Sequence, residues 1–255
     1  RLHSSERALI RPIRSGVVDC GYQVIVVGGG HAGVEAAWAA ANLYPSDGGE
    51  NPPVALVTMN PGTIGVMSCN PAIGGLAKGQ LVREIDALGG LMGLATDATG
   101  IQFRVLNTSK GPAVHGPRAQ CDKHAYAETV RSMLATRSNI RIIGGSVEEL
   151  LVGTGGIKGV VIREGEGGLV RLGARAVVLT TGTFMRALMH SGETRTAGGR
   201  WGEGSAVGIS GSLAALGFEL GRLKTGTPPR LARESIDWEA LEPQWGDHTP
   251  VPFSD

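Results

Sequence analysis

The amino-acid sequence predicts an α/β fold with a mixed sheet, and three observations support this class. Residues 22–27 form an apolar run that turns through glycines into the alanine-rich stretch 34–41, which is the order strand, tight turn, helix. Short β-rich runs broken by glycine follow over residues 140–181, which predicts an antiparallel meander returning to a central strand. The 255 residues are 42% apolar and include 41 glycines without a fixed period, which indicates a globular core with many turns.

The glycine turn after the first strand carries a dinucleotide-binding fingerprint. Glycines at positions 28, 30 and 33 let the turn tighten, the backbone approach a pyrophosphate, and the helix pack on the strand. The helix N-terminus adds free N–H groups and a partial positive charge. We therefore expect a diphosphate to be held by the residues Gly28, Gly29, Gly30, His31, Ala32 and Gly33. The expected role of His31 is a hydrogen bond that holds the loop.

The second strand, expected over residues 54–58, departs from the usual fingerprint. A dinucleotide fold normally carries an acid for the ribose hydroxyls at the end of this strand, about 20 residues past the glycines. Asp47 and Glu50 lie at that count but belong to a turn-rich loop, and the strand end reads Met59-Asn60. The sequence therefore predicts no acidic ribose contact at this position.

Two glycine-rich or polar segments separate the next helices. Residues 62–79 form a long loop leading into a helix over about 80–88, and the polar, turn-rich residues 100–120 precede a helix over 122–137. Long ordered loops in compact domains are usually functional.

The meander completes the plan of the nucleotide-binding part. Its strands are expected over residues 140–143, 147–152, 157–163, 169–172 and 176–181. The last strand meets Thr181 and Gly182, whose backbone would approach the same dinucleotide. This order of elements suggests the two-dinucleotide flavoprotein plan, a Rossmann-like domain of the glutathione-reductase type with FAD along the strand ends.

The last part of the chain contains a helix near residues 205–216 and a basic segment, 221–230. Three cations there, Arg222, Lys224 and Arg230, are held by glycine and proline and are candidates for phosphate contact, with a solvated basic turn as the alternative. Since the net charge is only +1, RNA binding requires such a local patch. We expect a basic tail over 1–20, a FAD-binding domain over 21–220 and the start of an inserted domain over 221–255.

Composition also bears on compartment and on metal binding. The serine- and arginine-rich residues 1–16 resemble the end of an organellar transit peptide, or else a disordered basic tail, so the expected location is mitochondrial or otherwise cytoplasmic. Three cysteines are too few for a disulfide framework. Cys121 and His124 have a spacing that could share a helical face, but no other ligands cluster there and we expect no metal site. No run approaches the about 18 to 20 apolar residues that a membrane span requires.

Several stretches together resemble one protein family, the tRNA uridine 5-carboxymethylaminomethyl modification enzymes known as GidA or MnmG, including mitochondrial members. The stretches are residues 28–37, 68–75, 84–92, 100–107, 109–114 and 222–230. The resemblance runs from Tyr22 to the end of the chain, and members of the family are more than twice this length. It implies that the returning part of the FAD domain and the helical C-terminal region are missing here.

The resemblance implies an enzyme that modifies carbon 5 of the tRNA wobble uridine with a carboxymethylaminomethyl or taurinomethyl group. It implies FAD as cofactor, NADH as reductant, methylene-tetrahydrofolate as one-carbon donor, an MnmE-type GTPase as partner and a homodimer in the full-length protein. The family pattern places the backbone of Val147 against the adenine. A serine near the flavin falls close to Ala206, so Ser205 is the candidate. Lys110, together with the basic segment, is expected to contact tRNA.

A thiol is needed because carbon 5 of uracil is a poor nucleophile, whereas a thiolate adding to carbon 6 makes the ring an enolate that attacks an electrophilic methylene. Cys69 is the catalytic candidate, since Lys78 and the following helix lie close in sequence and would lower its pKa. The alternative is a packed cysteine that shapes the Asn70-Pro71 turn.

Three other functions remain open. The folate-dependent tRNA uridine methyltransferase shares the FAD plan, but it typically carries an acid after the second strand, and Met59-Asn60 argues against it. A generic NAD(P)H-linked flavoprotein oxidoreductase would leave the Ser68-Cys69-Asn70-Pro71 loop and the basic segment unexplained. The third is a flavin-binding module without enzymatic activity.

Overall fold

The chain forms two compact units, which we describe separately. The computed structural model describes residues 19–45, 52–68, 70–165, 167–226 and 228–254, so most of the expected basic tail and the catalytic candidate Cys69 lie outside the described residues. The first unit contains 1–66 and 127–220, and the second contains 67–126 and 221–255. Residues 67–126 thus belong to the same unit as the residues after 220.

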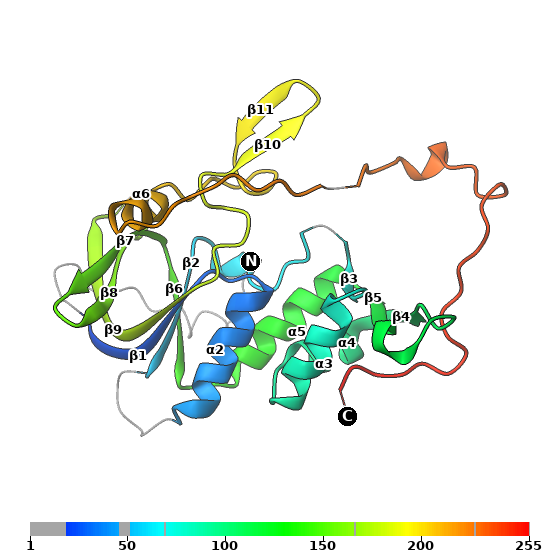
Figure 1. Ribbon diagram of the computed structural model, residues 1–255, viewed down its shortest axis with the longest axis horizontal. Coiled ribbons are helices and arrows are strands. Elements are labelled where there is room, and N and C mark those ends of the chain that lie inside the picture. The colour runs from blue at the N-terminus through cyan, green and yellow to red at the C-terminus, as the bar shows by residue number, and fades with distance from the viewer. Residues whose placement is uncertain (1–18, 46–51, 69, 166, 227, 255) are drawn as a thin grey trace. The chain divides into compact units, whose positions relative to one another are not determined.

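The first unit is built on a six-stranded mixed sheet with the order β6-β2-β1-β9-β8-β7. Its strands are labelled in Figure 1. Its elements are β1 (Asp19–Val27), α2 (His31–Leu43), β2 (Val54–Thr58), β6 (Ile140–Gly144), β7 (Ser146–Gly153), β8 (Gly156–Arg163) and β9 (Leu169–Leu179). The strands β6, β2, β1 and β9 are parallel, and β9, β8 and β7 are antiparallel. This arrangement confirms the predicted α/β class with a mixed sheet.

The apolar run of the first strand becomes the centre of this sheet. Ile25 and Val26 are fully buried because β1 lies between β2 and β9, and all five residues of β2 are buried. Continuous apolar runs of this kind are typical of parallel strands covered on both faces. Helix α2 packs against β1 and β2, and its buried face includes Val34, Ala37 and Trp38.

Two details of the predicted meander are wrong. Strand β6 does not belong to it, because β6 pairs in parallel with β2 at the edge of the sheet. Residues 169–179 form one continuous strand instead of two, although Gly173 lies at its middle. Pairing with β1 and β8 along its length fixes the strand. Gly173 lies directly opposite Gly159, where a Cβ would collide with the Leu172 carbonyl.

After β9 the first unit continues into a β-ribbon and a helix. Strands β10 (Leu188–Ser191) and β11 (Thr194–Ala197), which the sequence did not predict, pair with each other, and α6 (Gly208–Ala215) follows. The Ser212 hydroxyl accepts a hydrogen bond of 2.9 Å from the Leu150 amide, which fixes α6 against β7. A side chain at position 208 would collide with Glu148, so glycine permits this close packing.

The second unit contains a three-stranded antiparallel sheet of order β3-β5-β4 and two helices. Its elements are β3 (Ala72–Gly74), α3 (Lys78–Ala87), α4 (Met92–Thr99), β4 (Gly100–Leu106), the short 3-10 helix η2 (Pro112–Val114) and β5 (Gly116–Cys121). The interpretation of residues 100–120 as a turn-rich segment is therefore wrong over residues 100–106 and 116–120, because these residues form β4 and most of β5 and pair within the three-stranded sheet. Helix α4 was also not predicted.

The C-terminal residues complete this second unit. Phe253 is only 1% exposed, and the Asp97 carboxylate accepts hydrogen bonds of 2.8 Å from the amides of both Phe253 and Ser254. Arg83 donates to the carbonyls of Pro252 and Phe253 at 3.0 Å. These charge-assisted contacts hold residues 252–254 against α3 and α4. Between residues 221 and 254 the regular structure described is the short 3-10 helix η3 (Arg233–Ser235).

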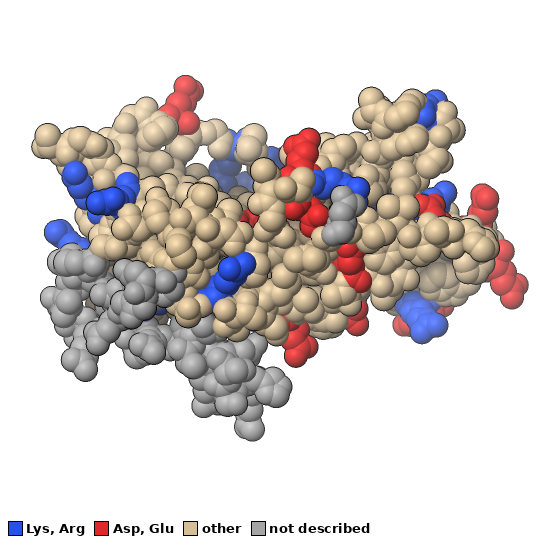
Figure 2. Space-filling view, turned by 90° about the horizontal axis from the view of Figure 1, so that it is seen from below, with Lys and Arg blue, Asp and Glu red and all other residues tan. Residues whose placement is uncertain are grey.

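Helix α5 (Lys123–Ala135) begins in the second unit and continues in the first. Its start is capped by Asp122, whose Oδ1 accepts from the amides of His124 (2.9 Å) and Ala125 (3.0 Å). Within the described part of the chain, no helix has the length and apolar character to cross a membrane. On the face drawn in Figure 2, acidic and basic side chains are interspersed, which agrees with the small net charge.

Candidate functional site: the glycine turn between β1 and α2

The turn between β1 and α2 is fixed by close packing on the end of β9. Gly28 has a φ of 112°, and a side chain there would collide with the Thr180 carbonyl. The Thr180 hydroxyl donates to the Val27 carbonyl at 2.7 Å and to the Gly28 carbonyl at 3.3 Å. A Cβ at Gly33 would collide with the Gly28 carbonyl, so helix and strand meet without an intervening side chain. Gly28 and Gly33 thus perform the tightening and packing roles predicted for the turn.

Gly30 differs from both, because its missing side chain faces open space. An added Cβ would have no protein atom within 4 Å among the described residues, and the backbone at φ −76° accepts any residue. Gly30 and Ala32 are exposed, and α2 begins at His31 with no side-chain cap or first-turn acid among the described residues. Sterics of the protein itself therefore do not require glycine at 30. The open cradle in front of a helix N-terminus fits the diphosphate of a dinucleotide.

The end of β2 lies beside the same turn and carries no acid. A Cβ at Gly29 would meet the Thr58 hydroxyl at 2.8 Å, and the Gly29 carbonyl accepts from the Gly65 amide at 3.1 Å. Met59 is 39% exposed. The Asn60 side chain accepts from the Gly62 amide at 2.9 Å, which caps the short 3-10 helix η1 (Pro61–Thr63). Asn60 therefore stabilises the loop that follows β2.

The other predicted cofactor residues of the first unit lie in different local settings. Thr181 and Gly182 follow β9 directly, and Gly182 is exposed with a φ of 56°. The Val147 side chain is buried in the core while its backbone pairs with Ile162 of β8. The Ser205 hydroxyl accepts from the Ala187 amide at 2.9 Å and donates to the Phe184 carbonyl at 3.3 Å. A contact of Val147 or Ser205 with the cofactor stays a prediction.

Sequence reasoning passed over Thr180 as a positioning residue. Its hydroxyl and its amide both donate to the Val27 carbonyl, so it joins the carboxyl end of β9 to that of β1. The available signal was a hydroxyl residue ending an apolar strand next to a Thr-Gly pair. Its partner could not be read from the sequence, because the two strands are 153 positions apart.

All four residues predicted to contact RNA belong to the second unit. Lys110 is exposed in the loop between β4 and β5, where its carbonyl lies 3.2 Å from His115 Nε2. Arg222, Lys224 and Arg230 are exposed in a segment without regular secondary structure. The segment from 221 to 233 carries four cations and no acid, and it includes Leu223, which is 97% exposed. Phosphate contact by these residues remains a prediction.

Lys78, which was expected to lower the pKa of Cys69, and the second cysteine, Cys121, both lie in the described part of the second unit. Lys78, the first residue of α3, donates from Nζ to the Ala72 carbonyl at 3.5 Å. Cys121 is the last residue of β5 and is buried, so it does not share a helical face with His124 on α5. Burial raises the pKa of the Cys121 thiol. Among the described residues, no group of three or more His, Cys, Asp or Glu side chains could hold a metal ion.

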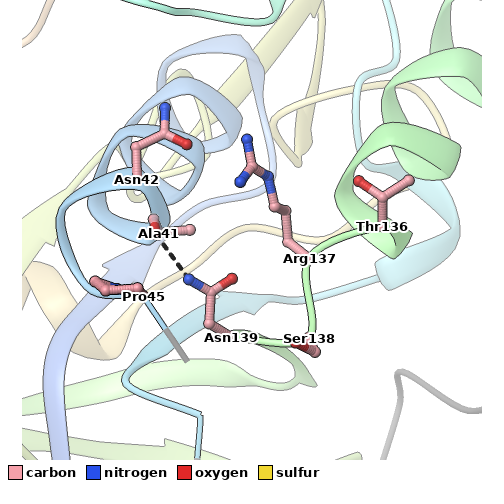
Figure 3. Close-up of a pocket in the computed structure, with 7 residues that line it drawn as sticks. All are labelled: Ala41, Asn42, Pro45, Thr136, Arg137, Ser138 and Asn139. Carbon is pink, nitrogen blue, oxygen red and sulfur yellow. Dashed lines mark hydrogen bonds between the residues drawn. The ribbon is translucent and has the colours of Figure 1, made fainter. Parts of the chain in front are cut away.

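A separate shallow pocket lies at the C-terminal end of α2, as Figure 3 shows. Asn139 is one of its lining residues and donates to the carbonyls of Ala41 (2.7 Å) and Tyr44 (2.8 Å), which caps the helix. The Arg137 guanidinium stacks on the Trp38 ring at 4.0 Å. Because this pocket is at the opposite end of α2 from the glycine turn, it is not part of the candidate dinucleotide site.

The comparisons with known proteins identify the family of the chain. The family model described as glucose inhibited division protein A matches residues 23–255, which begins at β1 and includes the whole glycine turn. The chain belongs to this family. The match also covers the residues of the second unit.

Two relatives share about half of their aligned residues with this chain. The tRNA uridine 5-carboxymethylaminomethyl modification enzymes MnmG of Rhodopirellula baltica and Granulibacter bethesdensis are 51% and 53% identical, each over 91% of this chain. The crystal structure of Aquifex aeolicus GidA (form II) superposes with a TM-score of 0.82 at 46% identity, covering 94% of this chain and 38% of that one. This chain spans 36% of the length of the two MnmG relatives.

Proposed function

We propose that this chain acts, in a protein of its relatives' length, as the FAD-binding part of an enzyme that modifies tRNA uridine. The observation that carries the proposal is the glycine turn, which is packed at Gly28 and Gly33 but open at Gly30. The names of the MnmG relatives support tRNA uridine as the substrate. The proposed modification is a carboxymethylaminomethyl or taurinomethyl group at carbon 5 of the wobble uridine.

In this proposal the chain's own groups hold the cofactor by its diphosphate. The amides at the start of α2, from His31 to Gly33, belong to the first turn, which has no carbonyl acceptor within the helix, and they carry the positive end of the helix dipole. Thr180 keeps the turn in place through its hydrogen bonds to Val27 and Gly28. When bound, FAD supplies the redox chemistry for a one-carbon unit from methylene-tetrahydrofolate, with NADH as reductant.

Cys69 is the proposed nucleophile on the uracil ring. Its thiolate would add to carbon 6, which makes carbon 5 an enolate carbon able to attack an electrophilic methylene. Loss of the proton from carbon 5 and elimination of the thiolate from carbon 6 would then restore the uracil ring and the free cysteine. Lys78 and the N-terminus of α3 follow shortly after it in the chain and would stabilise the thiolate. Replacing Cys69 with serine in the full-length protein should abolish modification, and modification at the full rate would refute this assignment.

Two matched variants of the full-length protein test the cofactor site. Gly30→Ala places a methyl group in the open cradle, so we expect the apoprotein to melt as wild type while FAD affinity falls on the order of tenfold, equivalent to about 1.4 kcal/mol. Gly33→Ala forces a Cβ against the Gly28 carbonyl and should destabilise the apoprotein itself by about 1–3 kcal/mol. Unchanged FAD affinity in Gly30→Ala would contradict the proposed diphosphate position.

The substrate and partners are tested separately from the cofactor. A strain lacking the protein should lose the wobble modification, which nucleoside analysis of its tRNA measures directly. We further propose an MnmE-type GTPase as partner and a homodimer of the full-length protein. Copurification with the GTPase and light scattering of the purified protein test these two statements.

A further inference from the structure

The ribbon formed by β10 and β11 leaves both of its faces exposed. It projects from the sheet of the first unit, as Figure 1 shows, and residues 190–197 are all exposed. A two-stranded ribbon gains little stability by itself, because it buries hardly any apolar surface. Most of these exposed residues are polar. The surface of the ribbon is therefore suited to contact with a polar molecule.

The base of this ribbon is held rigidly. The Arg200 guanidinium makes a two-pronged ion pair with the Glu203 carboxylate, with N–O distances of 2.6 and 2.9 Å. Gly199 lies so close to Phe184 that a Cβ would come within 2.5 Å of the ring. The Ser205 hydroxyl joins the backbone at Phe184 and Ala187. These contacts fix the two ends of the ribbon, at residues 184–187 and 199–205, where it joins the first unit.

The exposed side chains of the ribbon are hydrogen-bond donors suited to phosphate oxygens. Arg195 lies directly opposite His190 across the two strands, so both project from one face. On the other face, Ser191 and Thr194 also form a directly opposite pair and contribute hydroxyl groups. Arginine, serine and threonine are among the residues that most often contact the sugar–phosphate backbone of nucleic acids. The one acid in the ribbon, Glu193, lies in its turn.

The ribbon also follows the candidate cofactor site directly along the chain. Strand β9 ends beside the glycine turn at Thr180, and the chain enters β10 eight residues later. We propose that the face of the ribbon carrying His190 and Arg195 binds the sugar–phosphate backbone of the tRNA substrate near the flavin. This inference rests on the proposed function. It adds a nucleic-acid contact in the first unit, separate from the basic residues 222–230.

The test measures tRNA binding by the full-length protein carrying FAD, over a series of salt concentrations. Arg195→Gln should weaken binding about threefold to tenfold and reduce the magnitude of the logarithmic salt slope by about 0.7 to 0.9, because one phosphate contact is lost. Arg195→Glu should weaken binding further, while its visible flavin spectrum stays that of wild type. Arg171→Gln, an exposed arginine of β9 outside the ribbon, is the matched control and should bind as wild type.

The outcomes separate this inference from the proposed function. If Arg195→Glu binds tRNA with wild-type affinity and salt slope, the ribbon does not contact the phosphate backbone. If Arg195→Glu binds tRNA normally but no longer associates with the GTPase, the ribbon is a protein-binding element and the RNA inference is overturned. If the wild-type protein itself binds no tRNA, the proposed function fails and the inference fails with it.

Discussion

Thr180 shows how a single hydroxyl group can position the candidate cofactor site. Thr180→Val keeps the size of the side chain but removes the donor to the Val27 and Gly28 carbonyls. Since the Thr180 amide still bonds to Val27, we expect the loss of stability to be only about 1 kcal/mol. Urea unfolding of the apoprotein measures it. Thr180→Ser keeps the hydroxyl and should lose less, and an equal loss in both variants would contradict the proposed role.

Cys121 provides a second test at the scale of one residue. Burial raises the pKa of its thiol, and the side chain is 2% exposed, so the group stays protonated and shielded near neutral pH. We expect iodoacetamide to leave Cys121 unmodified in the folded protein at pH 7 and to modify it after unfolding in denaturant. Peptide mass spectrometry measures the labelling. Rapid labelling of the folded protein would show that β5 opens readily.

At the scale of an element, the start of α5 depends on one titrating group. Two backbone hydrogen bonds from Ala125 and His124 hold the pKa of Asp122 below its usual range. A lowered folded-state pKa adds stability that is present above the unfolded pKa of about 3.9 and is lost as pH falls through the folded value.

The matched variant for this helix cap is Asp122→Asn, because asparagine caps helices but does not titrate. We expect the free energy of unfolding of wild type to fall more steeply than that of the variant as pH drops below about 4. Equilibrium denaturation over an acid pH series measures the difference. Parallel curves would show that Asp122 does not contribute to acid sensitivity.

Elements with a strong local pattern were predictable from the sequence, and elements that depend on distant pairing were not. The apolar run of β1, the glycine turn and the alanine-rich α2 agree with prediction, because each is set by neighbouring residues. Strand β9 was predicted as two pieces because the pairing of Gly173 with Gly159 is invisible locally. Strand β4 has apolar residues at the alternating positions Ile101, Phe103 and Val105, and this signal was missed among the neighbouring turn residues. Strand β5 has little local pattern and depends on pairing with β3 and β4.

The position of the candidate site was predictable from the sequence, but the separate roles of its glycines were not. The fingerprint located the turn, but the sequence could not distinguish Gly30, which faces open space, from Gly28 and Gly33, which are required by packing. That distinction needs the position of Thr180, which follows the neighbouring strand β9 but lies 153 positions from Val27 in the sequence. The fingerprint also expects an acid after β2, where the structure instead has Asn60 capping the next turn.

At the scale of the whole molecule, the stability of the second unit depends on residues 252–254, the last residues that the structure describes. Phe253→Ala should destabilise this unit by about 3–5 kcal/mol, because it empties a fully buried aromatic site beside Gly74. We expect limited proteolysis of the variant to cut within 67–126 while β7, β8 and β9 stay protected. Val251→Ala, at a half-exposed position, is the control and should resist cleavage as wild type. Equal cleavage of both variants would contradict this dependence.

The hydrogen bonds between Asp97 and residues 253–254 also set an order of events during synthesis. Phe253 and Ser254 lie 156 and 157 positions after Asp97. The second unit therefore lacks the buried Phe253 ring until these residues have left the ribosome. Closing so long a loop is slow, and the unfinished unit exposes apolar surface in the meantime. We therefore expect chaperones to bind a nascent chain whose synthesis is halted shortly before Phe253.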